Sequence, residues 1–264
     1  MKGKELTLEE IREIQLNILT SIHNICEKYG IRYSLGGGTL LGAVRHQGYI
    51  PWDDDIDIMM PRPDYERFLE LYSEEGEYVV QDCHNDETYF YPFAKVYDQR
   101  TFLQELVVRS GVYVDVFPID GLPVKEKTEE YYKKLINIVY KEIYYSSKTY
   151  KIRDGNRYIL YAKYLLKRIL SPKRRIALQH LDNLVHSYEF DESEYAGSIC
   201  GRYGVKEHMP LDVFQHYIKL SFEGHYYNAI ENYDSYLKAH YGDYMQLPPI
   251  EKRVSNHINK VYWK

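Results

Sequence analysis

The chain has 264 residues, of which 44% are hydrophobic and 28% are charged, and its formal net charge is −5. This length and composition fit a globular protein with a sizeable core, and they exclude a disulfide-stapled peptide and a largely disordered chain. No apolar run approaches the ~18 residues of a membrane span, and no secretory signal is recognisable, so we expect a cytoplasmic protein.

The three cysteines, Cys26, Cys83 and Cys200, are odd in number, far apart and without a Cys-x-x-Cys pair. This spacing predicts neither a disulfide framework nor a zinc site. We expect buried free thiols.

The first predicted element is a long helix. Thr7 and Glu10 form a capping-box pattern, and isoleucines then recur every three or four residues until Tyr29 and Gly30 end the pattern. Residues 31–35 are predicted to form a short strand that leads into a run of glycines.

That run, Gly36 to Gly38, is predicted to be a turn, after which Thr39 caps a short helix through Arg45. Backbone amides at such a turn and the positive end of the following helix can hold phosphate oxygens. Gly37, Gly38 and Thr39 are therefore candidate phosphate-binding residues.

Alternating acidic and apolar residues over 55–60 predict a half-buried strand, which the prolines at 61 and 63 end before a helix over 64–75. Further strands are predicted over residues 79–81, 91–97 and 113–117. Pro118 and residues 121–123 mark a predicted boundary.

The second half of the chain is predicted to be helical over 125–188, with breaks near 154–156 and 171–172. The last segment is predicted to contain a hairpin of residues 217–222 and 225–227, a helix to about residue 240 and an irregular tail from residue 248.

These elements predict an α/β (α+β) fold in a single domain over 1–264. Its parts are a mixed sheet core flanked by helices over 1–121, a helical and basic region over 122–190, and a C-terminal hairpin and helix over 191–264 that complete the domain.

Positive charge gathers between residues 143 and 181, where ten basic residues stand against one acid. Apolar residues recur there at helical spacing, which predicts a basic amphipathic helix suited to anionic lipid or another polyanion. The alternative is an ordinary helix whose apolar face lies in the core. No nucleic-acid-reading motif accompanies the basic residues, so we expect no nucleic-acid partner.

Four aspartates, Asp53, Asp54, Asp55 and Asp57, stand within five residues. Those at 53, 55 and 57 share one face if the segment is extended. Carboxylates this close repel one another unless a hard cation neutralises them, and an all-oxygen set selects Mg²⁺ or Mn²⁺ over zinc. A solvated acidic turn is the alternative, which the interleaved apolar residues disfavour.

Asp115 stands alone in an apolar run over 112–117, where a carboxylate is costly to bury unless it is paired or bound to metal. Asp115 is the candidate third carboxylate of the site, or else it caps a turn or faces solvent. Asp120 is predicted to be a turn residue.

Arg45, His46 and Lys95 are candidate contacts to phosphate or to the leaving group. For each of them the alternative is a structural or surface role.

The sequence resembles the LicD-type phosphocholine transferase family, relatives of the fukutin-related ribitol-phosphate transferases. The resemblance is carried chiefly by residues 37–46 (GGTLLGAVRH) and 48–57 (GYIPWDDDID). Shorter matches are 93–96 (FAKV), 114–120 (VDVFPID), 222–224 (FEG), 241–245 (YGDYM) and 247–249 (LPP).

This resemblance implies a nucleotidyltransferase-like fold and transfer of a phospho-alcohol from a CDP-activated donor, CDP-choline, to a hydroxyl of a cell-surface glycan precursor such as teichoic acid, with release of CMP. It implies that Asp55 and Asp57, helped by Asp53, hold Mg²⁺ or Mn²⁺, while Asp115 completes the metal site or accepts the proton of the attacking hydroxyl. The acceptor would be built on a lipid carrier at the inner face of the membrane, where the basic stretch would dock.

Two further donors stay open, namely another CDP-alcohol (CDP-glycerol or CDP-ribitol) and a nucleoside triphosphate such as CTP or ATP. Trp52, next to the acids, is either part of a choline-binding aromatic surface or a residue that packs its loop onto the core.

Overall fold

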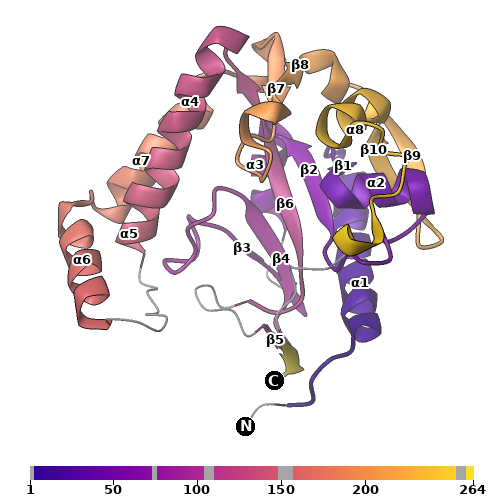
Figure 1. The fold of residues 1–264 in the computed structure, drawn as a ribbon, viewed down its shortest axis with the longest axis horizontal. Coiled ribbons are helices and arrows are strands. Elements are labelled where there is room, and N and C mark those ends of the chain that lie inside the picture. Colours follow the sequence, from indigo (N-terminus) through magenta and orange to yellow (C-terminus); the bar gives the residue numbers. More distant parts are fainter. Residues whose placement is uncertain (1–2, 73–75, 104–109, 148–156, 254–259) are drawn as a thin grey trace.

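A mixed β-sheet forms the centre of the protein in the computed structural model (Figure 1). The structure describes residues 3–72, 76–103, 110–147, 157–253 and 260–264, without the side chains of 157–160. The central strands follow the order β1-β2-β6-β4-β3, and β7 pairs with β6 and with β8. Helices pack around this sheet, so the predicted mixed α/β fold is confirmed.

The strands have the following bounds: β1 Ser34–Leu35, β2 Asp57–Pro61, β3 Tyr78–Gln81, β4 Ala94–Asp98, β5 Thr101–Leu103, β6 Tyr113–Leu122, β7 Tyr195–Gly197, β8 Met209–Pro210, β9 Tyr217–Phe222, β10 His225–Ile230 and β11 Val261–Trp263. The α-helices have the following bounds: α1 Leu8–Tyr29, α2 Gly37–His46, α3 Arg62–Leu71, α4 Lys125–Asn137, α5 Tyr144–Ser146, α6 Arg157–Leu170, α7 Arg174–Val185 and α8 Tyr233–Tyr241.

Strand β6 is the centre of the sheet. It runs parallel to β2 and antiparallel to β4, and this register places Asp115 beside both Asp57 and Lys95. The far end of β6 pairs with β7. One strand therefore connects the acidic segment with the C-terminal part of the chain.

Helix α1 forms as predicted. The Thr7 side chain accepts from the amide of Glu10 at 3.2 Å, and the Glu10 carboxylate accepts from the amide of Thr7 at 2.8 Å. Gly30 ends the helix in the left-handed conformation, at φ 63°. The isoleucines of one face are buried in the main core, against β4 and β6.

The glycine turn differs from the prediction at Thr39. Helix α2 begins at Gly37, with Gly36 rather than Thr39 as its N-cap. The Thr39 hydroxyl instead accepts from the amide of Asp57 at 2.9 Å, and so fixes the start of β2 to the first turn of α2. The strand that precedes the turn is shorter than 31–35, because only Ser34–Leu35 pairs with β2.

Strand β6 continues through Pro118 to Leu122, so Pro118 does not mark a boundary as predicted, and the change to the helical region falls after residue 122, where α4 begins at Lys125. Asp120 is not a turn residue. It lies in that strand with 2% of its surface exposed, and it accepts from Arg62 Nε at 2.6 Å. A buried ionic partner, invisible in the local sequence, makes the carboxylate tolerable inside the sheet.

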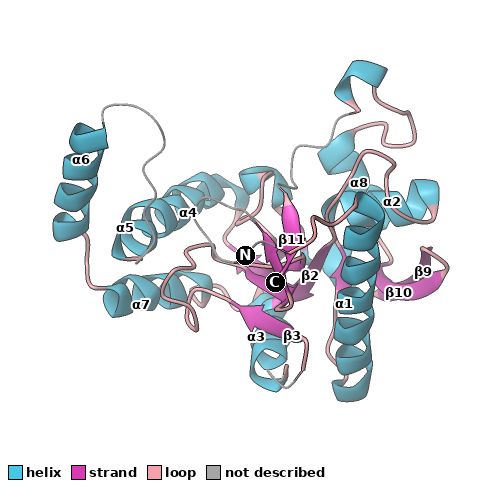
Figure 2. Cartoon of the chain, turned by 90° about the horizontal axis from the view of Figure 1, so that it is seen from below, coloured by secondary structure: helices cyan, strands magenta, loops and turns pink. Residues whose placement is uncertain are grey.

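The helical region contributes to a second hydrophobic core, in which α4, α7 and η1, a π-helix over Ile138–Ile143, pack against the loop between β3 and β4. Figure 2 shows these helices on the side of the sheet away from α1, with α6 at the far edge. The predicted break at 171–172 separates α6 from α7, whereas the break near 154–156 lies outside the described residues.

The predicted hairpin is confirmed as β9 and β10, and α8 follows it. The tail is not wholly irregular, because β11 pairs with β5. Cys26 and Cys83 are buried free thiols as expected, whereas Cys200 is partly exposed. Among the described residues, no helix combines the length and the apolar character that crossing a bilayer requires.

Candidate active site

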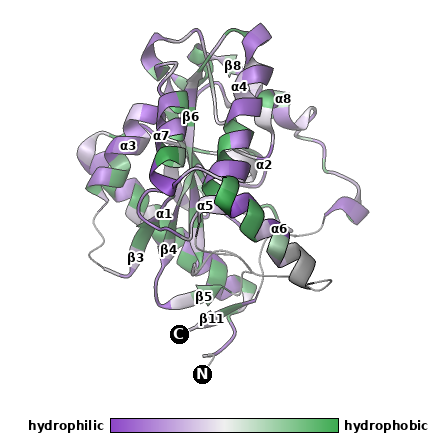
Figure 3. Ribbon diagram, turned by 90° about the vertical axis from the view of Figure 1, so that its left-hand side faces the viewer, coloured by the Kyte–Doolittle hydropathy of each residue, from purple (hydrophilic) through white to green (hydrophobic). Residues whose placement is uncertain are grey.

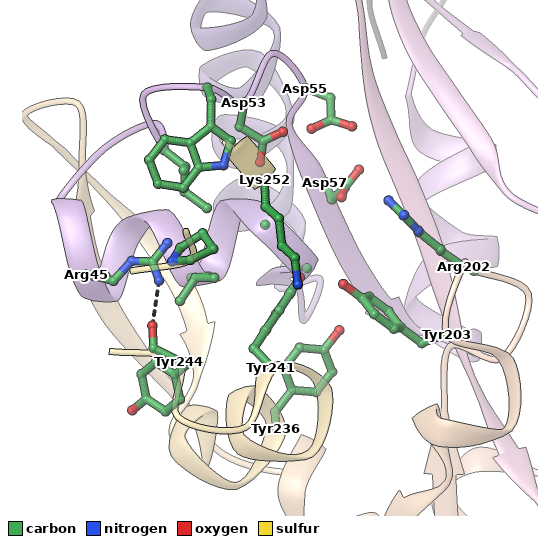
Figure 4. Close-up of a pocket in the computed structure, with 18 of the residues that line it drawn as sticks. Arg45, Asp53, Asp55, Asp57, Arg202, Tyr203, Tyr236, Tyr241, Tyr244 and Lys252 are labelled. Carbon is green, nitrogen blue, oxygen red and sulfur yellow. Dashed lines mark hydrogen bonds between the residues drawn. The ribbon is translucent and has the colours of Figure 1, made fainter. Parts of the chain in front are cut away.

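The predicted acidic residues line one cavity of about 1080 Å³. Asp53 and Asp55 come from the loop before β2, Asp57 is the first residue of β2, and Asp115 lies beside it on β6. Figure 4 shows the first three turned toward the same space. Asp54 is buried and is not among the lining residues.

Asp53, Asp54 and Asp55 each offer an oxygen atom within 4.8 Å of the others. This grouping includes Asp54, which the predicted metal-binding set omitted, and it leaves Asp57 and Asp115 on the adjacent strands. Carboxylates packed this densely are the oxygen-rich surroundings that hard divalent cations prefer.

Two glycines lie where α2 meets these acids. A Cβ atom at Gly38 would lie 2.6 Å from Asp53 Oδ2, and one at Gly37, which has φ +46°, would lie 3.0 Å from Asp57 Oδ2. The glycines thus let the backbone at the start of α2 approach both carboxylates closely.

The electrostatics of the site disfavour a negative charge on Asp57. Burial, together with the charges of Asp55, Asp115 and Asp53, raises the pKa of Asp57 well above its ordinary value, and the opposing charge of Lys95 does not offset this. A divalent cation at this position would supply the missing positive charge, so the residues present fit a metal.

Lys95 lies outside the cavity lining, behind Asp115. Its ammonium group is 2.6 Å from Asp115 Oδ1, with both side chains almost fully buried, and it stands 3.3 Å from the centre of the Tyr113 ring. Lys95 therefore holds Asp115 in place, and the structure does not direct it toward a phosphate.

Arg45 lines the cavity, and His46 lies beside it. Arg45 donates to the carbonyl of Tyr244 at 2.6 Å and to His46 Nε2 at 3.0 Å, and burial lowers the pKa of both side chains. Arg45 thus connects α2 to the C-terminal segment while facing the cavity.

Trp52 also lines the cavity, and one face of its ring is already covered. The guanidinium of Arg253 lies 5.3 Å from the ring centre, and His46 packs edge-on against the ring at 6.3 Å. These contacts favour the packing role for Trp52.

The opposite wall comes from C-terminal residues that the sequence reasoning missed as site residues. They are Arg202, Tyr203, Glu207, Tyr236, Tyr241 and Lys252. Figure 4 shows Arg202 and Lys252 directed into the cavity. The two cations make this wall suited to phosphate oxygens. The tyrosine-rich match at 241–245 was the available signal.

A buried acid–histidine pair supports the tyrosines of this wall. Glu207 Oε2 and His240 Nε2 are 3.2 Å apart, and their side chains are 5% and 0% exposed. Burial raises the pKa of Glu207. Burial by itself would lower the pKa of His240. The hydrogen bond and the negative charge of Glu207 have the larger effect, so the pKa of His240 is raised. The pair therefore favours retention of a proton.

Comparison with known proteins shows which family the chain resembles. A family model described as the LicD/FKTN/FKRP nucleotidyltransferase domain matches residues 30–152. The lipopolysaccharide cholinephosphotransferase LicD of Haemophilus influenzae is 35% identical over 98% of this chain and 99% of its own length.

More distant similarity connects the chain to ribitol 5-phosphate transferases named FKRP. The mouse protein is 34% identical over 36% of this chain and 18% of its own length. The human protein is 41% identical over 22% of this chain and 12% of its own length. The similarity thus extends over nearly the whole length of the bacterial protein and over part of each mammalian one.

Proposed function

The chain belongs to the LicD family, and we propose on that premise that it transfers phosphocholine from CDP-choline to a hydroxyl group of a cell-surface glycan precursor. The observation that carries this proposal is the full-length similarity to a cholinephosphotransferase, combined with four aspartates that line one cavity. In the reaction, the acceptor oxygen forms a bond to the phosphocholine phosphorus, and the bond to CMP breaks.

We propose that Asp53, Asp55 and Asp57 hold Mg²⁺ or Mn²⁺, with Asp115 beside them. A bound divalent cation would neutralise charge on the pyrophosphate of the donor as CMP departs. The support is the all-carboxylate set and the raised pKa of Asp57, which marks negative charge that the surrounding protein does not balance.

The cationic side chains of the cavity would bind the donor phosphates. Arg45, Arg202 and Lys252 all line the cavity, on the walls that flank the aspartates. Positive charge fixed around the phosphorus before the reaction stabilises the charge that develops as the bond to CMP lengthens. The amides at Gly37 and Gly38, at the start of α2, would add donors to the same oxygens.

Asp115 either completes the metal site or accepts the proton of the attacking hydroxyl. Its buried contact with Lys95, 2.6 Å long, fixes the carboxylate beside Asp57. A carboxylate held at one position serves either role better than a mobile one, because positioning supplies much of the rate enhancement.

The glycan acceptor is proposed from the same relative, which acts on lipopolysaccharide by its name. A teichoic acid or another polysaccharide precursor offers the same chemistry, a sugar hydroxyl near a lipid carrier. The FKRP similarity favours one second candidate, a donor with a different alcohol such as CDP-ribitol or CDP-glycerol.

The test is to incubate the purified chain with CDP-choline and Mg²⁺ or Mn²⁺, with and without a glycan acceptor, and to measure CMP by chromatography. Release of CMP that requires both metal and acceptor would support the proposal. Turnover of CDP-ribitol, CDP-glycerol, CTP or ATP in place of CDP-choline would overturn the donor. Asp191→Asn, in an exposed residue, is the matched control for substitutions in the cavity.

A further inference from the structure

Helix α6 carries an apolar face that the protein does not cover. Leu166, Ile169 and Leu170 are 58%, 78% and 76% exposed, and Leu165 and Tyr161 are also exposed. At 3.6 residues per turn these five residues fall on one half of the helix. Transfer of these side chains from water into an apolar environment would be favourable.

The opposite side of α6 is the side that holds it to the protein. Tyr164 is 4% exposed, and its hydroxyl donates to the carbonyl of Ser147 at 3.4 Å. Lys167 donates to the hydroxyl of Tyr145 at 3.0 Å. The apolar half therefore faces outward, and the alternative that it lies in the core is wrong for this helix.

Positive charge borders this exposed apolar half. Lys163 lies along one margin and Arg168 lies along the other, and both are exposed. Lys173 and Arg175, just beyond the helix, are exposed as well. Figures 1 and 2 place α6 at the outer edge of the molecule, and Figure 3 shows hydrophobic and hydrophilic residues alternating along it.

We propose that α6 is a docking helix for an anionic lipid surface, with its apolar half inserted at the level of the headgroups. Basic residues that flank an apolar face would contact the headgroups on both sides of the inserted residues. A second copy of the chain fits this face less well, because it would bring two basic stretches together. The proposal is independent of the proposed reaction and concerns a part of the chain outside the cavity.

The experiment is co-sedimentation of the whole chain with vesicles of pure phosphatidylcholine and with vesicles that also contain phosphatidylglycerol. We expect binding to the anionic vesicles only, weakened by salt. The triple variant Leu166→Gln, Ile169→Gln, Leu170→Gln should bind more than tenfold more weakly. The double variant Lys163→Gln, Arg168→Gln should also lose affinity, by roughly fivefold for each charge.

Two control variants match these changes. Tyr226→Gln removes an apolar residue that is 66% exposed on β10, and Lys133→Gln with Lys134→Gln removes two exposed charges on α4. Both should bind as the unaltered chain does. Circular dichroism of the α6 variants should show unchanged folding, because the altered side chains are mostly solvent-exposed.

Equal binding to both kinds of vesicle, or no binding, would overturn the proposal. Binding that survives the triple variant would assign it to another surface. Sedimentation velocity without lipid tests whether a second copy of the chain covers this face instead. If the unaltered chain is a dimer and the triple variant is a monomer, a second copy covers the apolar half of α6 and the lipid proposal is overturned. CMP release with a lipid-free acceptor is measured separately, so failure of docking and failure of the reaction are distinguishable.

Discussion

At the scale of single residues, Asp57 lowers the stability of the metal-free protein and is also a proposed metal ligand. Burial and three neighbouring carboxylates raise its pKa, so its ionised form destabilises the metal-free protein above the ordinary pKa of an aspartate. Asp57→Asn should therefore raise the free energy of unfolding by roughly 1–2 kcal/mol at pH 7.5 in EDTA. The same variant should lose more than ~100-fold in turnover.

Denaturant titration and CMP release measure the two effects. Retained turnover would remove Asp57 from the site, and a large loss of stability would show that its carboxylate makes contacts that an amide cannot replace.

Gly38 gives a steric prediction. A methyl group there would lie 2.6 Å from Asp53 Oδ2, so Gly38→Ala must move either the backbone of α2 or that carboxylate. We expect turnover to fall more than tenfold, because a shift of this size displaces a proposed metal ligand. Gly36→Ala is the matched control, since its nearest contacts would be 3.6 Å away. Equal activities of the two variants would contradict the prediction.

The Glu207–His240 pair gives a pH prediction. Both pKa values are raised, so the stability that the pair contributes is present at low pH and is lost as pH rises, from about 4.5 for Glu207 and from about 6.5 for His240. The difference in unfolding free energy between the unaltered chain and Glu207→Gln should therefore shrink from pH 5 to pH 8. Urea titrations measure it, with Glu130→Gln on the surface of α4 as the control. A difference that grows with pH would reverse the assignment.

At the scale of elements, Arg174 shows that part of the basic stretch is structural. Its guanidinium, at the start of α7, donates to the carbonyls of Cys83, Asp86 and Tyr89 and to the hydroxyl of Ser147. It thereby fixes the helical region to the loop between β3 and β4.

Arg174→Met should cost about 2–3 kcal/mol of unfolding free energy, because it leaves carbonyl groups without their charged donor. Arg175→Met, at an exposed neighbour, should change it by less than about 0.5 kcal/mol. Urea titration compares the two, and equal effects would mean that the contacts of Arg174 contribute little.

The elements that could be predicted are those whose signals are local. The capping box and isoleucine spacing predicted α1, and the turn residues predicted the β9–β10 hairpin. The course of β6 could not be predicted, because Pro118 indicates a break while β7 and the buried Arg62–Asp120 pair, both distant in sequence, stabilise the strand. Thr39 was misassigned for the same reason, since its partner lies on β2.

At the scale of the whole molecule, metal binding should stabilise the fold. A ligand that binds only the native state raises stability with its concentration. Mn²⁺ or Mg²⁺ at 100 times its dissociation constant should add about 2.7 kcal/mol, and thermal unfolding with and without metal measures the shift. The variant Asp55→Asn should abolish the shift, whereas Asp191→Asn should keep it. An equal shift in both variants would place the cation elsewhere.

Only one side of the cavity could be predicted from the sequence alone. The acids were predictable because they are clustered and interleaved with apolar residues, and the register of β2 and β6 then brought Asp115 beside them. Arg202, Tyr203 and Lys252 had no local pattern to mark them. They reach the site only because the chain returns to it after the helical region.

This return sets an order of events during protein synthesis. The cavity is lined by residues near 36–59, 115–117, 198–207 and 236–253, so the ribosome releases its acidic side long before its cationic and tyrosine-rich side. A chain still being made already contains β2, β6 and the aspartates, but it lacks the residues of the opposite wall. The nascent protein would therefore be unable to enclose a nucleotide until its last tenth has emerged, and catalytic competence would arrive only near the end of translation.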